Sequence, residues 1–236
     1  MALPKLNDNL KYEMVIPSTD KLVTYRPYLV KEEKLLLSAF ESKDQKQAMR
    51  AMVDTVVACV NDDIKTSELS TFDVEYMFTQ IRSKSVGESS TLRFKCEAEK
   101  CEKTTDVDID LTSVEITKPE NSGNVVELTD DISIELRYPT YDGFVKNYRE
   151  GVSEAEFGFQ MLEDCIVSIM TEDEQYLASD VSKKELSEFI DSMTNKQFEK
   201  IGEYLKTVPV MKKEVEFTCQ CGHENKVTLE GLQDFF

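Results

Sequence analysis

The chain has 236 residues, of which 40% are hydrophobic and 31% are charged, so it can fold as one large domain or two small ones and is too apolar for a disordered chain. The 28 Lys and Arg residues stand against 46 Asp and Glu residues, a formal net charge of −18, which argues against nucleic-acid phosphates and anionic membranes as partners. The excess acid either only maintains solubility or favours basic or neutral protein partners, and the composition leaves both interpretations open.

No run of apolar residues approaches the length that a membrane span needs. The first residues, Met1 to Lys5, also lack the charged region followed by an apolar region that defines a signal peptide. We therefore expect a protein that is not secreted and does not enter a membrane.

The first part of the chain predicts a β-hairpin followed by three helices. Residues 10–16 alternate roughly between apolar and polar, 17–20 have turn composition, and 22–25 fit a returning strand. Apolar residues then recur at helical spacing, and a capping-box pattern at Ser70 and Asp73 opens the third helical segment. The predicted helices cover residues 31–41, 44–60 and 70–84.

The middle of the chain changes to a period of two. Residues 92–96 and 107–111 alternate between apolar and charged, which predicts a hairpin with one solvent-facing side. After a turn at 118–123, residues 125–128 and 132–138 predict two further strands.

Helices return after residue 138. Three of their starts match capping boxes, because Ser153, Ser182 and Thr194 are each followed three residues later by Glu or Gln. The first of these helices is predicted to continue its inward apolar stripe as far as Ile169. Pro209 ends the helical series, and residues 213–218 and 225–229 predict two closing strands.

Helices dominate this order and the strands form local hairpins, which predicts an α+β fold rather than a doubly wound sheet. We expect a mainly helical body with an N-terminal hairpin, made of residues 1–87 and 139–212. We expect a second, discontinuous zinc-ribbon-like β module, made of residues 88–138 and 213–236.

Two distant segments share a pattern around four of the six cysteines. Residues 92–96 read Leu-Arg-Phe-Lys-Cys and residues 215–219 read Val-Glu-Phe-Thr-Cys, so each strand puts two apolar side chains and a cysteine on one face. Each segment then turns through a second cysteine. Because Zn²⁺ favours four soft ligands in a tetrahedron, two such hairpin tips predict a structural zinc site. Its ligands would be Cys96, Cys101, Cys219 and Cys221.

The alternatives are unliganded buried thiols or a disulfide, since neither pair has the usual spacing of two residues between cysteines. His223, the only histidine, could replace Cys221 as a ligand. Cys59 and Cys165 lie within apolar helical stripes and are predicted to be small core residues.

The sequence offers no recognisable catalytic site. It has no Gly-rich phosphate loop, no His-Glu-x-x-His and no nucleophile elbow. The adjacent acids at 62–63 and 130–131 occupy predicted loops, where a solvated surface is the simpler interpretation. We expect no enzyme and no small-molecule substrate; an enzyme that uses carboxylates alone is the remaining alternative.

Several stretches of the chain match one known family. They are residues 3–6 (Leu-Pro-Lys-Leu), 16–19 (Ile-Pro-Ser-Thr), 25–34 (Tyr-Arg-Pro-Tyr-Leu-Val-Lys-Glu-Glu-Lys), 39–42 (Ala-Phe-Glu-Ser), Tyr76, Ile81, 82–87 (Arg-Ser-Lys-Ser-Val-Gly), 221–223 (Cys-Gly-His) and 229–236 (Leu-Glu-Gly-Leu-Gln-Asp-Phe-Phe). In these stretches, which span nearly the whole chain, the sequence resembles the T4-like phage baseplate hub proteins.

The resemblance implies a non-enzymatic protein that serves the tail baseplate, either as a hub subunit or as an assembly factor (chaperone) for the hub. It implies other baseplate hub proteins of the same phage as partners. It also implies a place in the virion tail baseplate or in the infected host cytoplasm. The alternative function is a zinc-ribbon module that acts on nucleic acid or in transcription, against which the net charge argues.

Five residues are candidates for a partner interface: Tyr25, Arg26, Tyr28, Phe235 and Phe236. Aromatic and arginine side chains are favourable interface anchors. The alternatives are that the segment around Arg26 only links the first hairpin to the first helix, and that the terminal phenylalanines dock into the core of the chain itself.

Overall fold

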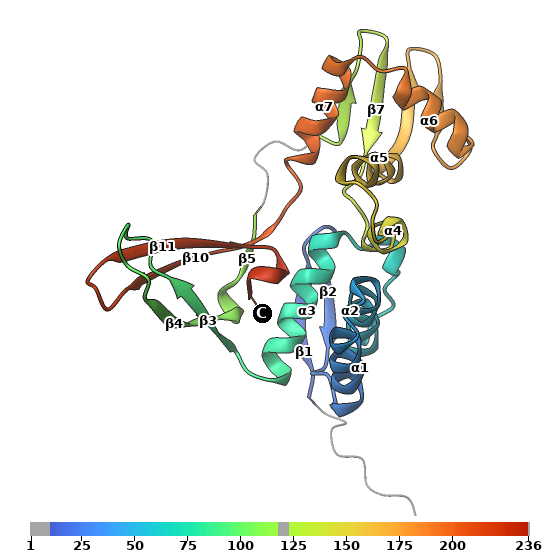
Figure 1. Cartoon of the computed structure of the whole chain (residues 1–236). Coiled ribbons are helices and arrows are strands. Elements are labelled where there is room, and N and C mark those ends of the chain that lie inside the picture. Colours follow the sequence, from blue (N-terminus) through green and yellow to red (C-terminus); the bar gives the residue numbers. More distant parts are fainter. Residues whose placement is uncertain (1–9, 118–122, 236) are drawn as a thin grey trace, which may run out of the picture. The chain divides into compact units, whose positions relative to one another are not determined.

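The computed structural model describes residues 10–117 and 123–235 (Figure 1). Contacts group the chain into two compact units. Unit 1 comprises Met1–Thr66, Phe72–Thr117 and Val210–Phe236, and unit 2 comprises Ser67–Thr71 and Lys118–Pro209. Both units contain helices and antiparallel strands, which confirms the predicted α+β class.

The first part of unit 1 is a hairpin followed by three helices, as predicted. The antiparallel strands are β1 (Tyr12–Ile16) and β2 (Lys21–Tyr25). The helices are α1 (Val30–Glu41), α2 (Gln45–Cys59) and α3 (Thr71–Ser85). The 3-10 turn η1 (Thr66–Glu68) precedes α3, and most of it belongs to unit 2. Figure 1 shows these helices beside the hairpin. Alternate strand residues are buried, namely Met14, Ile16, Val23 and Tyr25.

Arg26 and Glu32 fix the connection between this hairpin and the helices. Arg26 Nη2 lies 2.8 Å from Glu32 Oε1 and also donates to the Ala58 carbonyl near the end of α2. The other Glu32 oxygen accepts the N–H of Leu29, so it satisfies an amide at the start of α1. Burial alone would raise the pKa of Glu32, but these bonds outweigh it and hold that pKa below its ordinary value of 4.5.

The second part of unit 1 consists of two long hairpins. They are β3 (Ser89–Lys95) with β4 (Thr104–Asp110), and β10 (Met211–Thr218) with β11 (Glu224–Glu230). The short strand β5 (Glu115–Ile116) pairs with the start of β10, and the 3-10 turns are η2 (Leu111–Ser113) and η3 (Leu232–Phe235). One core fills the space between them: Ile109, Leu111, Val114, Met211, Val215, Leu229 and Phe235.

Contacts from α3 join the two parts of unit 1. The Thr79 hydroxyl lies 3.4 Å from the Met211 sulfur, and the Glu75 carboxylate accepts the N–H of Leu232. Burial raises the pKa of Glu75. The last described turn of the chain is therefore held by a helix of the N-terminal part.

Unit 2 is one antiparallel sheet with helices. Its strands lie in the order β6 (Val125–Glu127), β7 (Ile132–Leu136), β8 (Ile166–Thr171) and β9 (Gln175–Leu177). Its helices are α4 (Tyr141–Asn147), α5 (Glu154–Cys165), α6 (Lys183–Asp191) and α7 (Asn195–Leu205). The core joins strand and helix residues: Leu128, Ile134, Leu136, Leu162, Ile166, Leu186, Ile190, Ile201 and Tyr204.

The predicted capping boxes at Ser182 and Thr194 are both present, and Ser153 caps α5 through a bond from the N–H of Glu156. The predicted extent of α5 was wrong. The helix ends at Cys165, and residues as far as Thr171 form the strand β8 between β7 and β9. Val and Ile favour a pleated strand because their β-branched side chains restrict χ1, and pairing on both sides outweighed the helical apolar spacing.

The predicted domains group two segments of the chain differently from the two compact units. The prediction joined residues 139–212 to 1–87 and placed 118–138 with the cysteine hairpins, whereas most of both segments lies in unit 2. As independently folding domains, the predicted ranges remain a prediction. Among the helices of the described residues, none combines the length and apolarity that crossing a membrane requires.

Candidate metal centre

The two long hairpins of unit 1 present equivalent residues toward each other. The inward positions are Leu92 and Phe94 on β3 and Val215 and Phe217 on β10. Cys96 and Cys219 follow directly after the two strands, at the next inward positions, and both are buried. The rings of Phe94 and Phe217 stack with their centroids 5.4 Å apart. The strand alternation seen in the sequence thus places a cysteine from each hairpin at the same end of one apolar interface.

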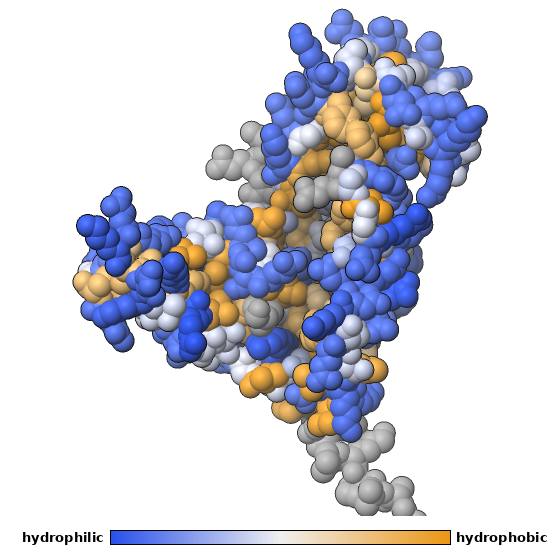
Figure 2. Space-filling view, in the orientation of Figure 1, coloured by the Kyte–Doolittle hydropathy of each residue, from blue (hydrophilic) through white to orange (hydrophobic). Residues whose placement is uncertain are grey.

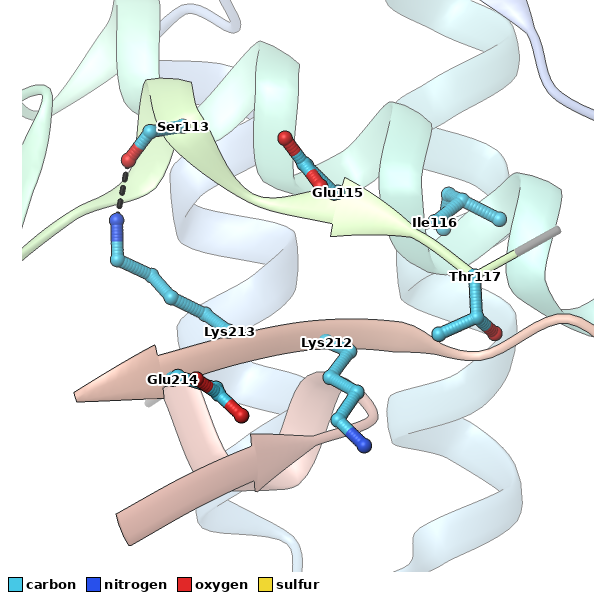
Figure 3. A pocket seen from close by; sticks show the side chains of 7 residues that line it. All are labelled: Ser113, Glu115, Ile116, Thr117, Lys212, Lys213 and Glu214. Carbon is cyan, nitrogen blue, oxygen red and sulfur yellow. Dashed lines mark hydrogen bonds between the residues drawn. The ribbon is translucent and has the colours of Figure 1, made fainter. Parts of the chain in front are cut away.

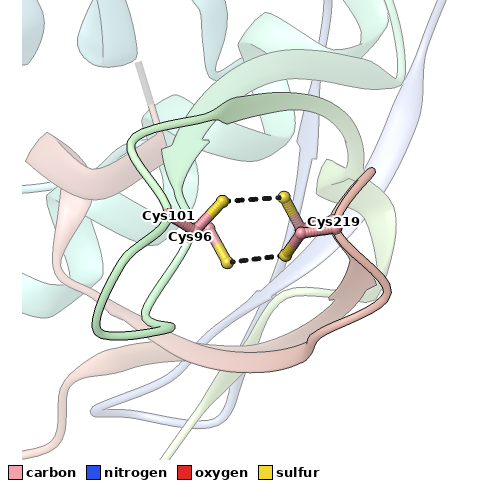
Figure 4. Close-up of side chains that lie close together, drawn as sticks. Cys96, Cys101 and Cys219 are labelled. Atoms are coloured by element: carbon pink, nitrogen blue, oxygen red, sulfur yellow. Dashed lines mark hydrogen bonds between the residues drawn. The ribbon is translucent and has the colours of Figure 1, made fainter.

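Four sulfurs meet there (Figure 4). The Sγ atoms of Cys96 and Cys221 are 3.7 Å apart and those of Cys101 and Cys219 are 3.8 Å apart. All four lie within 4.8 Å of one another, so the structure brings together every predicted ligand. A tetrahedron with metal–sulfur bonds of about 2.3 Å has edges of about 3.8 Å. The four cysteines could therefore hold a metal ion without a rearrangement of the hairpins.

The backbone around the sulfurs is equivalent in the two hairpins. The N–H of Cys96 donates to the Lys103 carbonyl and the N–H of Cys219 donates to the His223 carbonyl, so each loop closes around its cysteines. Gly222 occupies the second loop with a φ of 88°, a conformation that costs glycine little and residues with a side chain more. Gly222 therefore allows the chain to reverse in a short loop, in which the single residue Gln220 separates Cys219 from Cys221.

The pKa values of the Cys219 and Cys101 thiols shift in opposite directions. The N–H of Cys221 donates to Cys219, and with the neighbouring thiols it lowers the pKa of Cys219 to about 7. The N–H of Lys103 acts in the same direction on Cys101, but burial and the other sulfurs raise the pKa of Cys101 to about 11. The thiolate of Cys219 thus forms readily near neutral pH, and a metal ion would displace the proton that Cys101 holds.

Asn225 supports this centre and was not identified from the sequence. Its side chain is 3% exposed and its Oδ1 accepts the N–H of Glu97 in the other hairpin at 2.9 Å. Its Nδ2 donates to the His223 carbonyl within its own loop. The signal was an amide at an inward position of β11, where the next two inward residues, Val227 and Leu229, are apolar.

The remaining sulfur and imidazole groups lie outside the centre. Cys59 and Cys165 are fully buried, as predicted, and burial raises their pKa values to about 11 and about 12. His223 is exposed and does not belong to the four-residue group. The alternative in which His223 replaces Cys221 is not needed, because Cys221 is within reach.

A surface pocket lies at the other end of β10 (Figure 3). It is lined by Ser113, Glu115, Ile116, Thr117, Lys212, Lys213 and Glu214. The Lys213 ammonium donates to the Asp110 carbonyl and to the Ser113 hydroxyl, and Lys212 pairs with Glu230 at 3.1 Å. These lining residues include no histidine or cysteine, and both lysines are engaged in bonds that hold β10 in place.

The predicted interface residues have different surroundings. Tyr25 is 2% exposed and Phe235 is fully buried, so both pack inside unit 1. Arg26 is engaged with Glu32, and Tyr28 is half-buried with its N–H bonded to the Ser85 hydroxyl. Phe236 lies outside the described residues. Whether any of the five contacts a partner stays a prediction.

One comparison with known proteins gives a match. The family model described as T4 bacteriophage base plate protein matches residues 9–236. Neither the curated proteins nor the solved structures give a match.

Proposed function

The chain belongs to the T4 bacteriophage base plate protein family, and from that membership we propose that it serves the central hub of a contractile-tail baseplate. It would do so as a hub subunit or as a chaperone of hub assembly, through contacts with other baseplate proteins. The match over residues 9–236 carries this proposal, because it covers nearly all of both units. In this role the protein is non-enzymatic and works in the virion tail baseplate or in the infected host cytoplasm.

The cysteine centre supports a structural contribution to this role. We propose that Cys96, Cys101, Cys219 and Cys221 hold one Zn²⁺ ion, for which four thiolates are a preferred ligand set. Four protein ligands leave no position for water or substrate, so such a site fastens rather than catalyses. It would join two hairpins that are distant in sequence, since Cys101 and Cys219 are 118 residues apart.

The outward face of β4 argues against the alternative of a nucleic-acid module. It exposes Asp106, Asp108 and Asp110, of which Asp106 pairs with Arg93 across the hairpin. A carboxylate row of this kind repels phosphates, whereas nucleic-acid binding needs a basic face.

Co-expression tests the proposed role. The tagged chain is produced with each hub protein of its own phage, and complexes are isolated by affinity and size. A stable complex with at least one hub protein is the expected result. If the folded chain associates with none of the hub proteins, the proposal is refuted. Comparing assembly intermediates with finished virions then separates a subunit from a chaperone that departs.

Metal analysis tests the zinc centre. We expect one zinc ion per chain in protein purified without chelator, and loss of that ion in Cys96→Ser and Cys219→Ser. Cys59→Ala is the matched control, because it removes a thiol from the buried helical core and should leave the metal content unchanged. A folded wild-type protein without any bound metal would refute the centre.

A further inference from the structure

Two exposed aromatic rings lie side by side on unit 2. Phe159 of α5 is 47% exposed and Phe198 of α7 is 36% exposed. Their ring centroids are 5.3 Å apart with an angle of 39° between the planes. Figure 2 shows hydrophobic side chains gathered on this unit between α6 and α7, with hydrophilic side chains around them. We call Phe159 and Phe198 the aromatic pair.

The surface beside the aromatic pair is open. Gly158 precedes Phe159 in α5, and Gly202 lies one helical turn after Phe198 in α7. A Cβ atom added at either glycine would meet no atom within 4 Å. No other side chain fills the space at these two positions, and Gly202 shares the face of Phe198 on α7. Exposed aromatic side chains are enriched at protein interfaces, where they often act as anchors.

The charges around the aromatic pair are acidic. Glu156 and Glu163 lie three residues before and four residues after Phe159, positions that share its face of α5. The nearest cation on α7 beyond Phe198, Lys200, donates to the Glu127 carbonyl of the β6 strand at 2.7 Å and is thereby held there. Lys196 and Lys200 each lie two residues from Phe198, off its face of α7. Among the positions three or four residues from either ring, the charged side chains are Glu156 and Glu163.

Negative charge also predominates in unit 2 as a whole. Its residues include 9 Lys and Arg against 21 Asp and Glu, a net charge of −12. Unit 1 has 19 against 25, a net charge of −6, although it is the longer unit. The acid of the protein is therefore concentrated in the unit that exposes the aromatic pair, and its field favours the approach of positive charge.

We propose that the aromatic pair is a docking site for a basic segment of a partner protein, one that combines an apolar side chain with arginine or lysine. The apolar side chain would occupy the open surface beside Gly158 and Gly202. A guanidinium would stack on an aromatic ring and pair with Glu156 or Glu163. A second copy of the chain is a poor occupant, because two molecules of net charge −18 repel each other.

This inference rests on the proposed function in one respect, since it takes the partner to be another baseplate protein. The test uses two variants of the full chain. Phe159→Ala with Phe198→Ala removes the rings, and Glu156→Lys with Glu163→Lys reverses the charge while keeping them. The control is Val30→Ala with Leu37→Ala, which trims two exposed apolar side chains of α1 in unit 1.

Each protein is titrated with the hub proteins of its phage and, separately, with a short synthetic amphipathic helix that carries leucine and arginine. The same peptide with glutamate in place of arginine is the negative probe. We expect both variants to bind about tenfold more weakly than wild type and control, and wild-type binding to weaken as salt is raised. Circular dichroism and unfolding curves verify that the variants are folded.

The outcomes separate the two proposals. If the wild type binds hub proteins and the variants bind equally well, the docking site is refuted and the proposed function stands. If the wild type binds no hub protein, the function fails and the peptide decides the docking site: equal binding by variants and wild type, or no binding, refutes it. If sedimentation shows a wild-type dimer that the ring variant abolishes, the occupant is a second copy and the basic partner is refuted.

Discussion

Unit 1 and unit 2 differ in how many segments of the chain they are built from. Unit 2 is built almost entirely from one continuous stretch, Lys118–Pro209, and its strands and helices follow one another along the chain. Unit 1 is assembled from segments on both sides of that stretch, and its two long hairpins belong to separate sheets whose contacts include the four cysteines. Closing such a long loop costs conformational entropy, which a metal centre offsets. We therefore expect unit 1 to depend on the metal and unit 2 not to.

The largest effect tests that difference directly. Removing the metal with a chelator, or replacing Cys96 by Ser, should destabilise unit 1 by on the order of 5 kcal/mol or more. Hydrogen exchange should then lose protection in β3, β4, β10 and β11 while the strands of unit 2 keep theirs. Equal loss of protection in β7 and β8 would show that the two units do not unfold separately.

A cavity introduced into the core of unit 2 should destabilise unit 2 and leave unit 1 unchanged. Ile134 on β7 is fully buried, and Ile134→Ala should cost about 3 kcal/mol in the free energy of unfolding of unit 2. Urea unfolding followed by hydrogen exchange measures this. The control is Val125→Ala, which trims a 47% exposed residue of the same sheet and should change little. Zinc content should stay the same in both variants, and its loss in Ile134→Ala would contradict separate units.

Glu32 provides a smaller effect with a pH signature in unit 1. Glu32→Gln weakens the bonds to Arg26 and Leu29 and should cost about 2 kcal/mol at neutral pH. The folded protein holds the pKa of Glu32 below 4.5, so its stabilisation is complete above that pH and is lost as the pH falls through the lowered pKa.

The difference in unfolding free energy between wild type and Glu32→Gln should therefore shrink in acid. Glu33→Gln, at an exposed neighbouring position of α1, is the control and should show no such trend. A difference that stays constant into strong acid would mean that the Glu32 charge does not contribute.

The smallest effect tests local stabilisation in unit 2. Ser182 caps α6 in a reciprocal arrangement with Glu185, and Ser182→Ala should cost about 1 kcal/mol. Thermal unfolding measures the shift. Lys184→Ala removes an exposed ion pair with Glu188 in the same helix and should cost only about 0.3 kcal/mol. A larger loss from Lys184→Ala than from Ser182→Ala would contradict the assigned role of the cap.

Local patterns predicted the parts of the molecule that local chemistry determines. The hairpin β1–β2, the first three helices and the caps at Ser182 and Thr194 follow from turn residues, apolar periodicity and side-chain hydrogen bonds. The cysteine group was predictable because the two hairpins repeat the same inward pattern before each first cysteine.

Long-range pairing explains what the sequence did not reveal. Residues 166–171 have apolar spacing that fits both a helix and a strand, and only β7 and β9 on either side decide for the strand. Asn225 has its role through a bond to Glu97, which is 128 residues away in the chain. The grouping of residues 118–138 with 139–209 likewise depends on sheet pairing between β7 and β8.

The placement of the two cysteine hairpins also sets an order of events during translation. Cys101 leaves the ribosome 118 residues before Cys219, which at about 5–20 residues per second is a delay on the order of 10 s. Lys118–Pro209, which makes up nearly all of unit 2, leaves the ribosome in that interval. Cys96 and Cys101 therefore remain without Cys219 and Cys221 during the time in which unit 2 can fold. A complete centre requires a chain that has been synthesised through β10 and Cys221.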